Sequence, residues 1–211
     1  MAQQTQNVLL EEAYVAITNA LNVSQLQEPL RSFGYDEAKL RGGLAHHTTV
    51  KQLTQQREGA TQTARETSAL YQRTLKQLTE LFQLHRDTAR LAYKREAQYI
   101  DHLKLTARRK DASADMLAQA ETFYANVPVA MMEKYRISAK EIAETAKLVT
   151  QVRDLKAMRT HTQSQVQSLT RARNQALSAL QTWMSHFMTI AKIALEQQPQ
   201  QLEALNRTVA S

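Results

Sequence analysis

Apolar residues recur at alternating intervals of three and four along most of this chain, which is the spacing of an amphipathic α-helix. The most apolar run is ALQTWMSHFMTIAKIAL at 179–195, in which Trp183, Ile190 and Ile193 widen the apolar stripe. Polar residues such as Lys192 interrupt the run, and a membrane-spanning helix needs about 20 mostly apolar residues. We therefore predict a buried helix face at this position and no transmembrane segment.

A second run with the same pattern lies at 74–93. When the sequence is shifted by 102 residues, this run aligns with 176–195 without a gap, so that Leu78 meets Leu180. The same shift holds upstream, where Val50 meets Val152. An ungapped register over about sixty columns indicates an internal duplication of one helical unit.

Two predicted helix starts have the same separation of 102 residues. Asp36 and Ser138 are each expected to cap a helix N-terminus, with an apolar residue before the cap packing on another four residues after it. These apolar pairs are Tyr35 with Leu40, and Ile137 with Ile142. Glu141 follows Ser138 by three residues, which predicts a capping box at the second start.

The spacing of Gly and Pro predicts an all-α fold. Neither residue occurs between positions 60 and 127, whereas strands need turn residues every 8–12 positions. We predict an antiparallel bundle of four long helices plus short helices, built from two tandem repeats of a short helix and a long helical hairpin. The predicted hairpin tips lie near Gly59 and His161.

The predicted boundaries follow from these signals. One helical-bundle domain is expected over 1–211, with repeat one at about 7–110, repeat two at about 111–197 and a C-terminal tail at 198–211. The short helices are predicted at 7–27, ending near Pro29, and at 112–126, ending at Pro128, with a short turn from Pro199; the long helices are predicted at 36–57, 61–107, 138–159 and 164–197. Residues 1–6 are expected to be loose, and RRKDAS at 108–113 is expected to break the helix.

Three segments carry a resemblance to known proteins. FYANVPVAM, NQALSALQTWM and ALEQQPQQLEALNRTVAS resemble an uncharacterised group of bacterial all-helical bundle proteins. The resemblance covers most of the chain and consists of core and cap residues. It implies a helical-bundle fold and a bacterial source, and it implies no activity.

Composition limits the chemistry that this chain can perform. It contains no Cys, which excludes disulfides, thiolate metal sites and a cysteine nucleophile. No nucleophile elbow or phosphate-binding loop is present, so we expect a non-enzymatic protein without a cofactor. The first residues lack the basic and apolar regions of a classical signal peptide. We expect a cytoplasmic location, with export by another route left open.

Histidines are the one unusual feature of the predicted core. Four of the six align with an apolar residue in the other repeat, so we expect them to be at least partly buried; they are His46, His47, His85 and His186. His85 and His186 follow their predicted hairpin tips at similar distances, which makes them weak candidates for a metal, haem or pH-sensing site. The favoured interpretation is that these imidazoles only pack inside the bundle.

The net charge of +7 is concentrated in one segment. Residues 61–110 contain eleven Lys and Arg against five Asp and Glu. The candidate interaction residues form a basic stripe that comprises Arg86, Arg90, Lys94, Arg108 and Arg109. Such a stripe is typical of a solvated face, of a contact with an acidic surface on another subunit, or of a phosphate backbone site.

Two further features have a packing interpretation and a binding interpretation. Gly42 and Gly43 lie inside a predicted helix, where they indicate close helix packing within the chain or close approach of a partner. Trp183 and Phe187 fit an ordinary core better than a small-molecule pocket.

These patterns favour a structural or interaction protein that self-associates through its helical bundle. Its expected partner is a further copy of itself, in a homo-oligomer or filament. The less favoured alternatives are a polyanion- or nucleic-acid-binding module that uses the basic segment 86–110, and a cofactor- or metal-binding bundle.

Overall fold

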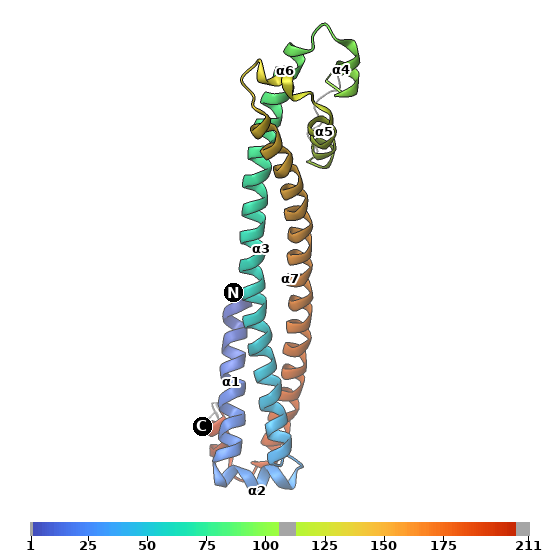
Figure 1. Ribbon diagram of the computed structural model, residues 1–211. Coiled ribbons are helices and arrows are strands. Elements are labelled where there is room, and N and C mark those ends of the chain that lie inside the picture. The colour runs from blue at the N-terminus through green and yellow to red at the C-terminus, as the bar shows by residue number, and fades with distance from the viewer. Residues whose placement is uncertain (1, 106–112, 206–211) are drawn as a thin grey trace. The chain divides into compact units, whose positions relative to one another are not determined.

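Every regular element in the described part of the chain is helical, which confirms the all-α prediction. The computed structural model describes residues 2–105 and 113–205, and the side chains of residues 6–105 and 115–205. Its elements are α1 (Ala2–Asn22), α2 (Ser24–Ser32), α3 (Glu37–Ala92), α4 (Ala97–His102), α5 (Ser113–Asn126), α6 (Val129–Glu133), α7 (Ala139–Ala194) and the 3₁₀ helix η1 (Pro199–Leu205) (Figure 1). Within these described segments, no helix combines the length and the apolar character needed to cross a membrane.

The predicted hairpins are wrong, because α3 and α7 are each one continuous helix of 56 residues. Four long helices are therefore replaced by two, and neither Gly59 nor His161 marks a turn. One glycine costs a helix only about 1 kcal/mol relative to alanine. The residues around it are mostly Gln, Thr, Arg, Glu and Ala, and none is proline. Their polarity reflects exposure rather than a break in the helix.

Several other helix boundaries also differ from the prediction. Helix α1 already includes residues 2–6, which were expected to be loose, and it ends at Asn22. Pro29 lies inside α2, where it removes only one bond of a nine-residue helix. Helix α3 ends at Ala92 rather than near 107, and the expected break at 108–113 falls mostly outside the described residues.

Both predicted N-caps are confirmed. The Asp36 carboxylate accepts a hydrogen bond from the backbone N–H of Lys39 at 2.9 Å. The Ser138 hydroxyl accepts one from the backbone N–H of Glu141 at 3.2 Å. The capping box differs from the prediction, because the Glu141 carboxylate contacts His85 instead.

Matching features of the chain lie 102 residues apart, as the predicted duplication requires. The bounds of α3 and α7 have this separation at both ends. Gly34 and Arg136 have it too, and both adopt a left-handed backbone, with φ of 82° and 65°. In both turns the following residue donates a backbone hydrogen bond back across the left-handed position, from Tyr35 to Leu30 and from Ile137 to Met132. The internal repeat stays a prediction, and these coincidences support it.

Contacts divide the chain into two compact units, to both of which α3 and α7 contribute. The first unit comprises residues 1–60 and 166–211. Its buried side chains come from α1, α2, the start of α3 and the end of α7, and include Ile17, Leu30, Leu40, Leu180 and Phe187. Small residues of α1, including Ala13 and Ala20, are fully buried, so this helix packs closely.

The second unit comprises residues 61–165. Its core joins the second half of α3 with α5, α6 and the first half of α7, and includes Leu78, Phe82, Phe123, Met132 and Val152. Leu103 and Leu105, at and after the end of α4, are also buried in this core. The two apolar runs each have a buried face as predicted, and Leu78, Phe82, Leu180 and Phe187 within them are each at most 5% exposed.

Candidate functional site

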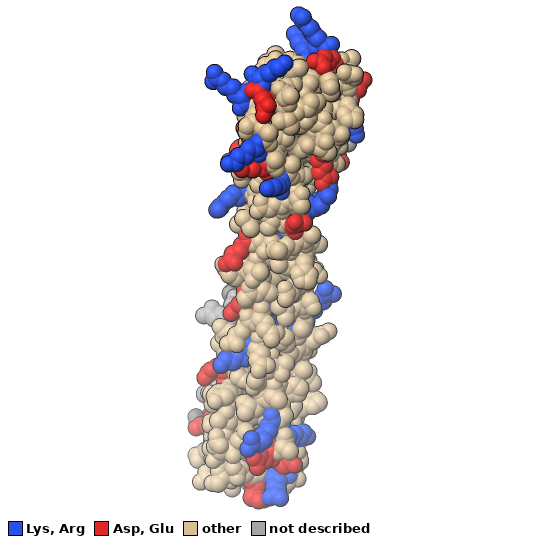
Figure 2. All heavy atoms as spheres, viewed as in Figure 1, with Lys and Arg blue, Asp and Glu red and all other residues tan. Residues whose placement is uncertain are grey.

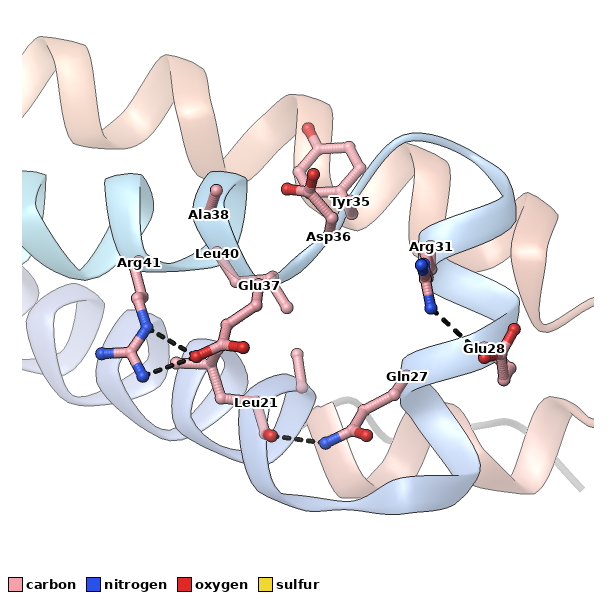
Figure 3. A pocket seen from close by; sticks show the side chains of 11 residues that line it. Leu21, Gln27, Glu28, Arg31, Tyr35, Asp36, Glu37, Ala38, Leu40 and Arg41 are labelled. Carbon is pink, nitrogen blue, oxygen red and sulfur yellow. Dashed lines mark hydrogen bonds and ion pairs between the residues drawn. The ribbon is translucent and has the colours of Figure 1, made fainter.

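The first unit contains a surface pocket of about 590 Å³. Figure 3 shows that its walls come from the end of α1, from α2 and from the first turns of α3. Ala20, Leu21 and Leu40 provide apolar surface, while Gln27, Glu28, Arg31, Asp36, Glu37 and Arg41 provide polar groups. The volume is in the range of small-ligand sites.

The polar groups of this pocket are already bonded to one another. Arg41 donates from Nε and Nη2 to Oε1 of Glu37, at 2.8 and 2.6 Å. Arg31 Nη1 lies 3.7 Å from Glu28 Oε1, and the Gln27 amide donates to the Leu21 carbonyl at 2.6 Å (Figure 3). A specific ligand site needs polar groups that converge on the ligand. These internal pairs leave the pocket without such a set.

Tyr35 is a lining residue of the pocket that is itself buried. Its ring packs on Trp183 and Phe187, with centroid distances of 5.8 and 5.3 Å. Burial raises the pKa of the Tyr35 hydroxyl above its usual value. The Lys39 ammonium lies 4.4 Å from the ring centroid, on the solvent side. The ring therefore stabilises the start of α3.

The second unit contains a polar cluster in which the buried His85 contacts the partly exposed residues Tyr124 and Glu141. His85 on α3 is 0% exposed. Its Nδ1 lies 3.0 Å from the Tyr124 hydroxyl on α5, and its Nε2 lies 3.0 Å from the Glu141 carboxylate on α7. In the neutral imidazole, Nε2–H donates to Glu141 and Tyr124 donates to Nδ1. Both ring nitrogens are then satisfied, as a buried histidine requires.

The surroundings of this polar cluster favour a structural role. Burial raises the pKa of Tyr124, and the neighbouring Glu141 carboxylate raises it further, while a hydrogen bond with Thr145 lowers it. Thr145 is 1% exposed, and its hydroxyl donates to the Glu141 backbone carbonyl at 2.8 Å. Because the His85 ring has no exposed surface, a substrate in solvent does not reach it. The cluster links α3, α5 and α7 through hydrogen bonds.

The two histidines predicted as weak metal candidates have different environments. His186 belongs to the first unit, where its side chain is exposed, whereas His85 is buried in the second. Within the described residues, no group of three or more His, Asp or Glu side chains is arranged to hold a metal ion. The expectation of burial was wrong for His186 and His46, which are exposed, while His47 is half-buried beside Tyr14.

Two arginines of the basic stripe form hydrogen bonds within the chain. Arg86 is only 5% exposed, and its Nη2 donates to the carbonyls of Lys104 and Leu105, each at 3.3 Å. Arg90 Nε donates to the Leu105 carbonyl at 2.8 Å, and its Nη1 lies 3.2 Å from Asp87. Both guanidinium groups therefore bind the turn that follows α4, where Lys104 has a left-handed φ of 51°.

The burial of Arg86 contradicts all three interpretations of the stripe, because each of them needs an exposed side chain. One sequence signal pointed to its burial, because the residue 102 positions later is the apolar Met188. Lys94 is exposed, as predicted. Arg108 and Arg109 lie outside the described residues.

Gly43 has the close helix packing that the sequence predicts. A Cβ atom added there would lie 2.4 Å from the Trp183 indole, inside the first unit. A Cβ atom added at Gly42 would meet nothing within 4 Å. Trp183 stacks on Phe187 at 5.2 Å, so these aromatic residues belong to the core rather than to a small-molecule pocket.

Sequence reasoning missed a row of exposed leucines on α3. Leu70, Leu84 and Leu91 are 46%, 56% and 62% exposed, although the repeat pattern had placed Leu91 and its counterpart Ile193 among the apolar face residues. Ile193 is 51% exposed as well. The sequence did contain a signal for this row. Leu84 follows Leu70 by 14 residues and Leu91 follows Leu84 by 7, and these intervals place the three leucines on one helix face, away from Leu78 and Phe82.

Comparison with known proteins finds no matching family model, no matching curated protein and no matching solved structure. This result is consistent with the resemblance to an uncharacterised group.

Proposed function

We propose that this chain is a non-enzymatic protein that self-associates through the exposed face of a long helix. This proposal rests mainly on three leucines of α3, Leu70, Leu84 and Leu91, which are 46%, 56% and 62% exposed. Single exposed leucines are ordinary, but these three lie on one helix face, and exposed apolar residues that gather on one face are found at interaction sites. The core of the second unit is complete without them.

Two features of the basic segment make polyanion binding a weaker explanation. Arg86 and Arg90 donate to backbone carbonyls of their own chain. On the face shown in Figure 2, Lys and Arg side chains alternate with Asp and Glu rather than forming an uninterrupted basic surface. A phosphate backbone is bound by cations that are free to replace its counterions.

Sedimentation velocity over about a hundredfold range of protein concentration tests the proposal, because self-association depends on concentration by mass action. We expect the mean mass to rise with concentration and to persist as salt rises, since an apolar contact is not screened. A protein that stays monomeric over the whole range would contradict the proposed function. Steep loss of DNA binding with salt would instead favour the polyanion-binding alternative.

A further inference from the structure

One face of α3 carries two parallel rows of residues at intervals of seven. The first row is Leu70, Gln77, Leu84 and Leu91, and the second is Arg73, Glu80 and Asp87. All seven residues are exposed. A spacing of seven corresponds to almost two helical turns, so each row follows one line along the helix. The rows span 22 residues, or about 30 Å of helix.

The leucines of the first row are not required by the fold of a helix of this kind. The residues 102 positions later on α7 are Ala172, Ala179, His186 and Ile193. Three of these four are small or polar, whereas Leu78 and Leu180, which are also 102 residues apart and are buried, are both leucine. The exposed leucine row is therefore found on α3 and not on α7, and we infer that a binding partner covers it.

The second row determines how a further copy of the chain fits this face. In a parallel pair, each residue meets its own copy, so that Arg73, Glu80 and Asp87 bring like charges together at three levels. In an antiparallel pair with Leu91 at the level of Leu70, Leu84 lies at the level of Gln77. Asp87 then lies beside Arg73 of the other copy, which is an attractive contact.

Only Glu80 remains close to its own copy in the antiparallel arrangement. Lys76 lies 4.0 Å from the Glu80 carboxylate and Arg90 Nη1 lies 3.2 Å from the Asp87 carboxylate on the same helix, so Arg73 is the residue of this row whose charge separates the two arrangements. The antiparallel arrangement also makes both copies use the same surface around a two-fold axis, which closes the pair. Charge and closure thus favour the same arrangement.

We propose that two copies of this chain pair through the 70–91 face of α3, antiparallel, with Leu91 packed on Leu70 and Asp87 beside Arg73. This proposal rests on the proposed self-association and specifies its surface and register. The partner is a second copy because the face matches its own charges when it is reversed. A contact of this kind leaves the buried residues of each copy unchanged.

The first test removes the apolar row. The double variant Leu84→Gln, Leu91→Gln replaces exposed leucines with a good helix former, so we expect unchanged unfolding and association weaker by at least about tenfold. Ile193→Gln is the matched control, because Ile193 is 51% exposed on α7 and lies 102 residues after Leu91. The control should associate like the parent chain.

The second test reverses the charges. Arg73→Glu or Asp87→Arg alone should weaken association by about two- to fivefold, the range of exposed ion pairs, and the double reversal should restore it. A parallel pair would respond differently, because each single change replaces one like-charge contact with another. Unchanged association in both single variants, or a lack of restoration in the double variant, would overturn the register.

The third test reads the register directly, and the absence of cysteine makes it clean. Single variants Leu70→Cys and Leu91→Cys are mixed and treated with a short bifunctional maleimide. The antiparallel pair predicts cross-links between the two different variants. Cross-links only within each variant would show a parallel pair and overturn the proposal.

The outcomes also separate this inference from the proposed function. If the parent chain associates and the leucine double variant associates equally well, the face is wrong and self-association stands. If the parent chain is monomeric, both proposals fail. Binding of that monomer to phosphatidylglycerol vesicles, lost in the leucine double variant, would assign the face to a membrane surface instead.

Discussion

The two units solve the same packing problem with different chemistry. Phe187 in the first unit and His85 in the second lie 102 residues apart, and both are 0% exposed. Phe187 packs on the rings of Tyr35 and Trp183. His85 is held by hydrogen bonds from two other helices instead. The predicted repeat would make these two positions equivalent, with an aromatic hydrocarbon in one unit and a hydrogen-bonded polar ring in the other.

The neighbours differ in a correlated way. Gly43 allows the Trp183 indole to reach the backbone of α3 in the first unit. Its counterpart 102 residues later is Thr145, which is buried and hydrogen-bonds to the Glu141 carbonyl in the second unit. The first unit makes space for a large ring, whereas the second supplies hydroxyl groups. Burial of a polar ring is tolerated only because those partners are present.

The aromatic side of this comparison predicts the largest effect. Phe187→Ala removes a fully buried ring from the centre of the first unit, so we expect a loss of about 3–5 kcal/mol in the free energy of unfolding. Urea unfolding followed by circular dichroism measures this loss. Leu84→Ala is the control on an exposed apolar residue and should change stability by less than about 0.5 kcal/mol. A loss under about 1 kcal/mol for Phe187→Ala would contradict its central position.

The sequence predicted the start of each long helix and much of its buried face. Asp36 and Ser138 act as caps because capping depends on residues close in sequence. The alternating spacing of three and four predicted the burial of Leu78 and Leu180, because apolar residues at this spacing lie on one face of a helix. The all-α fold was predicted from the absence of glycine and proline over long stretches of the sequence.

The same local signals failed where distant contacts decide the structure. Gly59 indicated a turn, but α3 continues through it, because a single glycine costs a helix only about 1 kcal/mol. Arg86 looked like a solvated cation, yet its bonds go to carbonyls 18 and 19 residues away, which no periodic pattern encodes. The polar cluster was missed for the same reason, because His85, Tyr124 and Glu141 come from three separate helices.

The next prediction concerns the polar cluster of the second unit, in which His85 is replaced by phenylalanine, the residue found at position 187 of the first unit. His85→Phe leaves the Tyr124 hydroxyl and the Glu141 carboxylate without their shared partner, so we expect a loss of about 1–3 kcal/mol in stability. Tyr124→Phe added to this variant removes one of the orphaned groups and should recover part of the loss. A double-mutant cycle from urea unfolding measures the coupling of the two residues. Additive losses would show that the hydrogen bond does not stabilise the fold.

The two adjacent glycines of α3, Gly42 and Gly43, test the aromatic packing of the first unit. Gly43→Ala pushes a methyl group into the Trp183 indole, and we expect a net loss of about 1–2 kcal/mol. Gly42→Ala meets open space and should instead gain about 0.5–1 kcal/mol, because alanine is the better helix former. Unfolding free energies of the two variants give the comparison directly. A gain at both positions would show that Trp183 moves aside freely.

Alkaline pH gives the smallest effect and tests the buried hydroxyl groups of the second unit. Burial raises the pKa of Tyr93 to about 12, with smaller contributions from Tyr99 and Glu96, and Tyr93 donates to the Pro128 carbonyl at 3.0 Å. Because the folded pKa lies above the unfolded value of 10.0, the stability that Tyr93 contributes is fully present below pH 10. It is lost as the pH rises towards 12, when the unfolded chain ionises first.

Tyr93→Phe isolates this contribution from other groups that titrate in the same range. At neutral pH we expect the variant to be less stable than the parent chain by about 1 kcal/mol, since a buried hydrogen bond is lost. Between pH 10 and 12 the difference should narrow, because only the parent chain loses stability through Tyr93. Urea unfolding midpoints at a series of pH values, read beside tyrosinate absorbance, provide the measurement. A difference that stays constant through this range would mean that Tyr93 ionises equally easily in the folded and unfolded chain, and that its hydroxyl lies in contact with water.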